Sequence, residues 1–188
     1  VLPGVYKVTL TYGDDEDSGS LEVIQDPRTN YSKPDLKANS IALDHLSNIN
    51  YTANMAVERI DFALHDIDLI KAMIKNAEDG SRKPEGDGET PLLKASKQAD
   101  DIKKILKDIR KFFRNPEGTK GITDGSFIVT YKISQGLRLV GGTKGKPSAT
   151  AIAAIKGAEH FVGLKLDEVN KIFEGELKAF KATVTGLK

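Results

Sequence analysis

The strongest candidate for a chemical site in this sequence is a group of three carboxylates and one histidine within residues 58–68. Its members are Glu58, Asp61, His65 and Asp68. They stand three, four and three residues apart, so on an α-helix all four share one face. Carboxylate oxygens and an imidazole nitrogen on one face are the ligands that a transition-metal site requires.

The same spacing argues against a metal site inside a helical bundle. The apolar residues of segment 57–67 repeat on the opposite side, so the four polar side chains are predicted to face away from the core. Metal sites in bundles project inward and need an i,i+3 Glu/His pair from partner helices. No partner segment supplies one, because His160 directly follows Glu159. We therefore expect a solvated face, with metal binding as the alternative.

No other constellation predicts catalysis. The chain has no cysteine, which excludes thiol nucleophiles, disulfides and cysteine-based zinc sites. His45 and His160 each directly follow a carboxylate, and neighbours in a helix do not face each other. No serine stands in a G-x-S-x-G elbow. The stretch 141–148 lacks the spacing of a phosphate-binding loop and is interpreted as a flexible helix–helix connection. We expect no catalytic residue and no cofactor.

A second candidate surface is a basic stripe on the segment 92–114. Its polyanion candidates are Lys103, Lys104, Lys107, Arg110 and Lys111. Such a stripe could bind polyanions by counterion release, but exposed aromatic residues do not interleave with it. The whole chain is nearly neutral, with 28 Lys and Arg against 27 Asp and Glu, and so does not predict nucleic-acid binding. We expect a solvated face partly paired with acidic neighbouring helices.

Apolar residues recur every three or four positions from residue 34 onward, which predicts helices. The expected helices cover about 34–79, 92–114, 127–140 and 147–184, the first and last being long. The third is the weakest prediction, since residues 128–131 alone are typical of a strand. Ser32 or Asp35 is the expected N-cap of the first helix. Asn50 falls on its apolar stripe, where it either fixes the register or lies at the edge of the seam.

The elements combine into a mainly α fold. We expect an elongated antiparallel up-down bundle of four helices over residues 34–188, joined by a linker at 27–33 to a β-hairpin at 1–26. The hairpin strands are expected at 5–12 and 20–25, with an acidic turn at 13–19. The connections 81–91 and 115–118 are expected to be loops rich in Gly and Pro.

The hairpin is interpreted as the last two strands of a β-sandwich whose earlier strands precede it in a longer protein, since the sequence begins at Val1 without Met. Its exposed strand edge is expected to pair with another chain or to cause self-association. No apolar run reaches the ~20 residues of a membrane span.

Residues Pro3–Leu10 and Leu21–Arg28 resemble the closing strands of the Ig/fibronectin-like module of secreted bacterial BNR-repeat, sortilin-type β-propeller proteins. In that family a long helical region follows, with a Leu-Tyr-Gly stretch and a Pro-Thr helix start to which Leu139–Gly141 and Pro147-Ser148 correspond. The resemblance implies a secreted or periplasmic, glycoside-hydrolase-like parent whose propeller would carry any catalysis. The implied partners are the propeller and sandwich upstream in the same polypeptide.

The expected function is therefore a non-catalytic, C-terminal accessory or interaction module of such a propeller protein. Two alternatives remain at this point. One is a polyanion-binding helical module that uses the basic second helix, and the other is a metal-binding bundle that uses the carboxylate–histidine face.

Overall fold

The computed structural model describes residues 2–80, 90–115, 118–119, 121 and 124–186. Its elements are β1 (Gly4–Tyr12), β2 (Asp15–Val23), α1 (Lys33–Gly80), α2 (Pro91–Phe113), the 3-10 helix η1 (Gly125–Phe127), α3 (Val129–Gly141), α4 (Ala149–Glu174) and α5 (Glu176–Gly186). The mainly helical class and the N-terminal antiparallel hairpin are confirmed. The expected loops at 81–89 and 116–117 lie outside the described residues.

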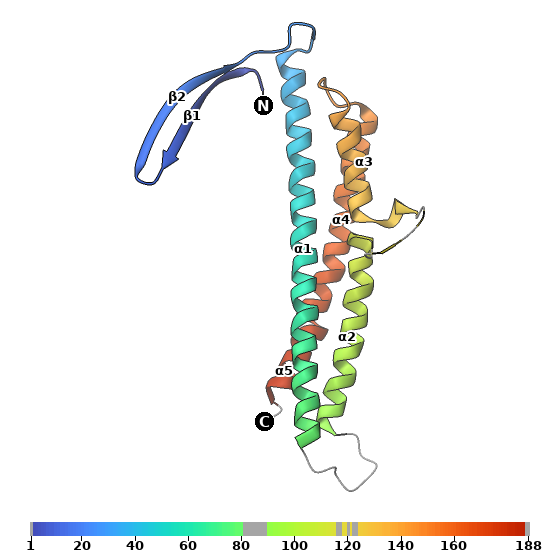
Figure 1. The fold of residues 1–188 in the computed structure, drawn as a ribbon. Coiled ribbons are helices and arrows are strands. Elements are labelled where there is room, and N and C mark those ends of the chain that lie inside the picture. Colours follow the sequence, from blue (N-terminus) through green and yellow to red (C-terminus); the bar gives the residue numbers. More distant parts are fainter. Residues whose placement is uncertain (1, 81–89, 116–117, 120, 122–123, 187–188) are drawn as a thin grey trace.

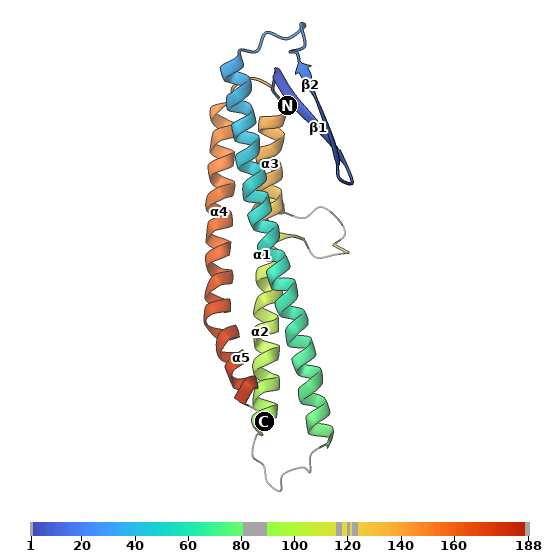
Figure 2. The same ribbon diagram turned by 90° about the vertical axis from the view of Figure 1, so that its left-hand side faces the viewer.

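The helices form three columns, as Figures 1 and 2 show. The long helix α1 is one column, α2 and α3 follow each other end to end in the second, and α4 and α5 run back in the third. The expectation that every helix lies antiparallel to the one before it is wrong for α2 and α3. At 1.5 Å per residue α1 spans ~72 Å and α2 only ~35 Å, so α2 covers about half of α1, and α3, which spans ~20 Å, covers part of the other half.

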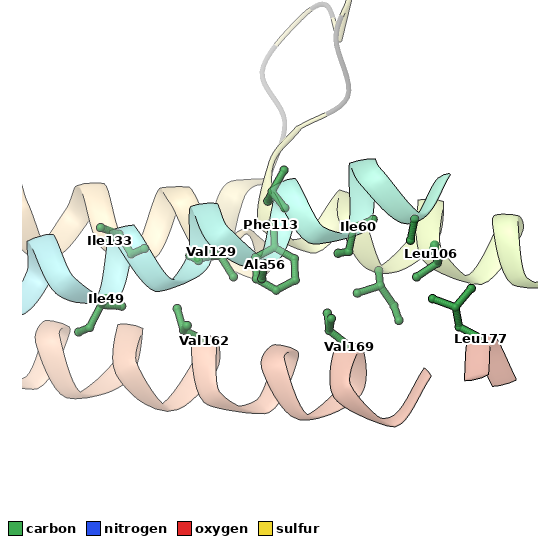
Figure 3. Close-up of a cluster of buried hydrophobic side chains, with 14 of the residues drawn as sticks. Ile49, Ala56, Ile60, Leu106, Phe113, Val129, Ile133, Val162, Val169 and Leu177 are labelled. Atoms are coloured by element: carbon green, nitrogen blue, oxygen red, sulfur yellow. The ribbon is translucent and has the colours of Figure 1, made fainter. Parts of the chain in front are cut away.

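A buried phenylalanine fills the joint of the second column. Phe113 is the last residue of α2 and is 1% exposed. Figure 3 shows its ring beside Ala56 of α1, near Val129 at the start of α3. The remaining core is almost entirely Leu, Ile, Val and Ala, which continues from one half of the bundle to the other without a break.

The third helix is present, although its first residues are typical of a strand. Val129, Ile133, Gly136 and Val140 are buried, and their spacing of four, three and four places them on one helical face. The β-branched residues stand at the very start of α3, and their burial in the core outweighs their low helix propensity. Helix propensity is a weak signal wherever tertiary packing is available.

The last predicted helix is divided at Gly175. A side chain there would place its Cβ 2.9 Å from the carbonyl oxygen of Lys171, which only glycine avoids. The Gly175 amide still donates to that oxygen at 2.9 Å, and Ala179 donates to the Gly175 carbonyl. The column therefore continues past the break. Its start agrees with the prediction, since Ser148 caps α4 by accepting from the Ala151 amide.

The hydrogen bonds at the start of α1 show which of the two predicted residues is its N-cap. Ser32 Oγ accepts from the Asp35 amide at 3.2 Å and donates to the Asp35 carboxylate at 2.7 Å. Ser32 is thus the cap, and the Asp35 carboxylate in the first turn accepts from the Ser32 hydroxyl and not from the Ser32 backbone amide as a capping box would have it. Asn50 is half-buried, whereas Asn39 is the buried polar residue among the side chains of α1 that the structure describes.

The hairpin has a tighter turn than expected. Only Gly13 and Asp14 connect the strands, and Gly13 has a φ of +61°, as the first central position of a type II′ turn requires. The acidic residues Asp15, Glu16 and Asp17 belong to β2 rather than to the turn. Both strands project from the bundle and are exposed along nearly their whole length, so charged side chains carry no desolvation cost there (Figure 1).

Candidate interaction surfaces

The carboxylate–histidine face of α1 is occupied by basic side chains of α2. Asp61 accepts two hydrogen bonds from Arg110, 2.6 Å from Nε and 3.0 Å from Nη2. Asp68 forms an ion pair with Lys103. Glu58 and His65 are exposed on the same helix. Within the described ranges, no group of three His, Cys, Asp or Glu side chains is placed to hold a metal ion.

These contacts belong to a ladder of ion pairs between α1 and α2. Its rungs are Asp61–Arg110, Asp68–Lys103 and Lys71–Asp100. From the first rung to the second, α1 advances by seven residues and α2 goes back by seven. From the second to the third, both change by three, so one antiparallel register explains all three pairs. The ladder therefore specifies how α2 lies against α1. It uses Asp61 and Asp68 of the metal candidate and Lys103 and Arg110 of the polyanion candidate.

Of the remaining basic candidates, one pairs with a carboxylate of α2 and two are exposed to solvent. Lys111 pairs with Asp108 one turn earlier at 2.6 Å, which lowers the pKa of the Asp108 carboxyl. Lys104 and Lys107 are exposed. Charge reversal at Lys103 or Arg110 would therefore disturb helix packing as well as any polyanion binding.

The ladder gives a testable dependence on pH. The hydrogen bond from Lys103 holds the pKa of the Asp68 carboxyl below its usual range. A depressed native pKa stabilises the fold above the unfolded-state value of about 4, and this contribution is lost as the pH falls through the native value. Because the Asp68 side chain is 53% exposed, Asp68→Asn should lower the free energy of unfolding by only ~0.3–0.5 kcal/mol at pH 7, and by nothing at about pH 2. The bidentate pair makes Asp61→Asn costlier, at about 1 kcal/mol.

Urea denaturation at the two pH values measures both effects. Asp101→Asn, at an exposed position of α2, is the matched control and should change stability by less than ~0.3 kcal/mol. An Asp68→Asn penalty of the same size at both pH values would show that the carboxylate charge is not what stabilises the contact.

Two polar contacts between distant segments escaped the sequence interpretation. Nε2 of His45 lies 3.2 Å from Oε1 of Glu159 and links α1 to α4. Nδ2 of Asn39 donates to the carbonyl oxygens of Val140 and Thr143 at 3.0 Å and of Gly145 at 3.2 Å.

The position of Asn39 explains its role. The connection 141–148, interpreted from sequence as flexible, is thereby tied to α1 by a side chain that is 4% exposed. One signal was available, because Asn39 stands three residues after Leu36 and four before Leu43, on the apolar stripe itself.

The hairpin presents an uncovered apolar surface. In the antiparallel register Tyr6 lies opposite Leu21, and Gly4 lies opposite Val23, so these residues share one face with the alternate residues of β1. We call this set the hairpin apolar face; its members are Tyr6, Val8, Leu10, Tyr12, Leu21 and Val23, and near the turn Asp15 and Asp17 lie on the same side of the hairpin, opposite Tyr12 and Leu10. All are exposed except Val23, which is half-buried. The opposite face carries mostly Lys, Thr, Ser and Glu.

Comparisons with protein-family models, curated proteins and solved structures find no match. The function must therefore be inferred from the surfaces that the fold presents. No described helix combines the length and apolar content needed to cross a bilayer.

Proposed function

We propose that this chain is a non-catalytic accessory and interaction module of a secreted, glycoside-hydrolase-like β-propeller protein. In this proposal the hairpin supplies the closing strands of an Ig/fibronectin-like sandwich. The observation that carries it is the hairpin apolar face, which projects from the bundle with no described residue packed over it as a core. The resemblance of Pro3–Leu10 and Leu21–Arg28 to sandwich strands supports the choice of partner.

The exposed face favours docking on energetic grounds. An isolated two-stranded hairpin is marginally stable in water, and a hydrophobic face packed on further strands is what stabilises such sheets. Burying one exposed Val, Leu or aromatic side chain contributes roughly 1.5–3 kcal/mol. At the end away from the turn, Tyr6, Val8 and Leu21 form a continuous apolar cluster, as on the inner face of a sandwich strand pair. Nearer the turn, Asp17 and Asp15 stand opposite Leu10 and Tyr12.

The two strand edges differ in a way that favours β1 as the growing edge. β2 carries Asp15, Glu16, Asp17 and Glu22, whose negative charges disfavour the approach of another acidic strand. β1 carries one charged residue, Lys7, among Val, Thr, Leu and Tyr. We infer that the preceding strands of the sandwich pair with β1.

The helical part fits a structural role better than the two alternatives. The metal and polyanion interpretations both need side chains that the ion-pair ladder uses: Asp61 and Asp68 for the first, Lys103 and Arg110 for the second.

The test measures amide hydrogen exchange in the hairpin of the full-length protein and of the 188-residue chain. We expect the β1 amides to exchange at least ~100-fold more slowly in the full-length protein, because docking covers the hairpin. Leu10→Glu should abolish this added protection, since it places a charge on the hairpin apolar face. Thr9→Glu, on the opposite face of the same strand, is the matched control and should retain it.

The proposal is overturned if hairpin exchange is the same in both proteins. It is equally overturned if the reading frame upstream of Val1 encodes no β-sandwich and no β-propeller.

A further inference from the structure

A long groove runs between α1 and the column of α4 and α5. Figure 2 shows α1 and α4 side by side. The groove contains three successive hollows of about 320, 600 and 410 Å³. His45 and Glu159 line both the first and the second hollow, and Leu166 lines both the second and the third. A fourth hollow of about 310 Å³ follows one turn further down, between Leu69 and Val184. From Ala38 to Ile70 the groove extends ~48 Å along α1.

An exposed apolar seam of α1 borders this groove. Positions 41, 48, 55, 62 and 69 recur every seven residues and are occupied by Ile, Asn, Met, Phe and Leu. The four apolar members are all exposed, and Phe62 is 71% exposed. Residues seven positions apart lie nearly on one line along a helix, so these four apolar side chains form a single exposed stripe. The core of the bundle uses a different face of α1, so this outer seam is a second packing surface.

A glycine on the opposite wall leaves room for a close approach. Gly163 lines the groove in the middle of α4, and a Cβ there would meet no atom within 4 Å. Glycine inside a helix costs roughly 1 kcal/mol relative to alanine. Packing within this chain gives no reason for that cost. An approaching helix would contact the bare backbone at this position.

We propose that a second copy of this chain occupies the groove, antiparallel to the first, with the two-fold axis at Met55. The outer seam is symmetric about Met55, so this arrangement places Ile41 against the partner subunit's Leu69. It likewise places Phe62 against the partner subunit's Asn48. A two-fold contact needs a self-complementary surface, and a seam with a central residue and matched ends provides one.

Charge and area agree with a second copy. Four acidic and four basic side chains line the hollows, so the groove has no net charge that would repel a second copy, and the like-charge approach is confined to Asp44 and the partner subunit's Asp66 at the two ends. A surface ~48 Å long and two helices wide, ~18 Å, covers ~900 Å² per copy, close to the ~800 Å² that each partner buries in a standard interface. This contact is separate from the hairpin and does not depend on the sandwich proposal.

Sedimentation equilibrium of the purified chain tests the contact. We expect a monomer–dimer equilibrium in the micromolar range, and Leu69→Glu should weaken it at least ~30-fold because the two-fold axis introduces the charge twice. Leu164→Glu is the matched control, since Leu164 is 48% and Leu69 is 52% exposed and both are on helices. Circular dichroism verifies that both variants are folded.

Three results would overturn the proposal. One is a chain that stays monomeric up to about 200 μM. Another is equal weakening by the control variant. The third is a dimer that resists Leu69→Glu but dissociates with Leu10→Glu, which would place the contact at the hairpin. The exchange experiment on the full-length protein is unaffected by any of these results.

Cysteine cross-linking tests the orientation, because the chain contains no cysteine of its own. A mixture of Ile41→Cys and Leu69→Cys chains should form a disulfide-linked dimer on oxidation, whereas either variant alone should not. Disulfides form only where the Cα atoms approach within about 7 Å. Efficient linkage of Ile41→Cys chains to each other would show a parallel dimer and overturn the antiparallel arrangement.

Discussion

Asn39→Asp is expected to lower the free energy of unfolding by about 3–5 kcal/mol at neutral pH, because it leaves a buried charge without a partner. The wild-type side chain donates from Nδ2 to three carbonyl oxygens, and an aspartate anion would instead present a negative oxygen to them. Burial and these carbonyl groups raise the pKa of the introduced carboxyl. Its penalty therefore grows as the pH rises above about 4, and it shrinks below that value, where the protonated carboxyl can donate one hydrogen bond.

Two further variants separate charge from lost hydrogen bonds. Asn39→Leu keeps a similar shape but removes the donors, and should cost about 1–3 kcal/mol with no dependence on pH. Asn76→Asp, at an exposed position of the same helix, should stay within ~0.5 kcal/mol of the wild type. Urea denaturation at about pH 7 and pH 3 measures all three. An Asn39→Asp penalty that is absent at pH 7, or unchanged at pH 3, would contradict the proposed role of the three carbonyl contacts.

The helices could be predicted from sequence because their ends carry strong local signals. Ser32 and Pro34 start α1, Gly80 ends it, and Ser148 starts α4. Gly175 was missed because a lone glycine inside an apolar periodic segment is often tolerated in a helix. Its effect depends on the approach of its Cβ position to the Lys171 carbonyl, which is a property of the bent backbone and not of the sequence pattern.

The number of columns could have been predicted from lengths alone. A helix of 48 residues cannot be covered by one of 23, so a further segment must bury the rest of its stripe. The rule that short connections make consecutive helices antiparallel fails where two helices share one long partner. Gly136 marks the place of α3 on this partner, since a Cβ there would lie 2.9 Å from Cδ2 of Leu46.

The candidate sites show the limit of periodicity. Asp61 and Asp68 each stand one residue after a core isoleucine, Ile60 or Ile67, which is ~100° around the helix, so they flank the core rather than lie opposite it as predicted. The basic residues recur in the same way on the next helix. That these two faces meet depends on the rotation and register of α2 against α1, which no single helix encodes. The sequence predicts that the basic stripe pairs partly with acidic neighbouring helices, whereas the identity of each partner, such as Asp61 for Arg110, depends on this placement.

In the hairpin, the acidic composition of one segment led to a wrong prediction of its secondary structure. Four consecutive acidic residues, 14–17, predicted a loop, yet three of them lie in a strand. Strand propensity depends on context, and an exposed strand accepts charges that a buried one excludes. The two-residue turn is set by Gly13, and this choice brings Tyr6 opposite Leu21 and produces the hairpin apolar face.

Phe113→Ala is expected to lower the free energy of unfolding by about 3–5 kcal/mol, as is typical for truncating a fully buried phenylalanine. The ring lies at the joint where α2 gives way to α3, and its loss would leave a cavity between Ala56 and Val129 (Figure 3). Neither helix end can collapse freely into this cavity, because the continuous helix α1 holds the spacing of the column. We therefore expect the cost to lie near the upper end of the range.

The neighbouring ring provides the control for this prediction. Phe112 is half-exposed and lies 3.9 Å beneath the Lys165 ammonium, so Phe112→Ala removes a cation–π contact and partial burial, at about 1 kcal/mol. Thermal and urea unfolding of both variants gives the comparison. Hydrogen exchange should also show faster opening of the last turn of α2 and the first turn of α3 in Phe113→Ala alone. Equal destabilisation by the two substitutions would mean that the joint is not held by the buried ring, and that the second column depends instead on the contacts each helix makes separately with α1.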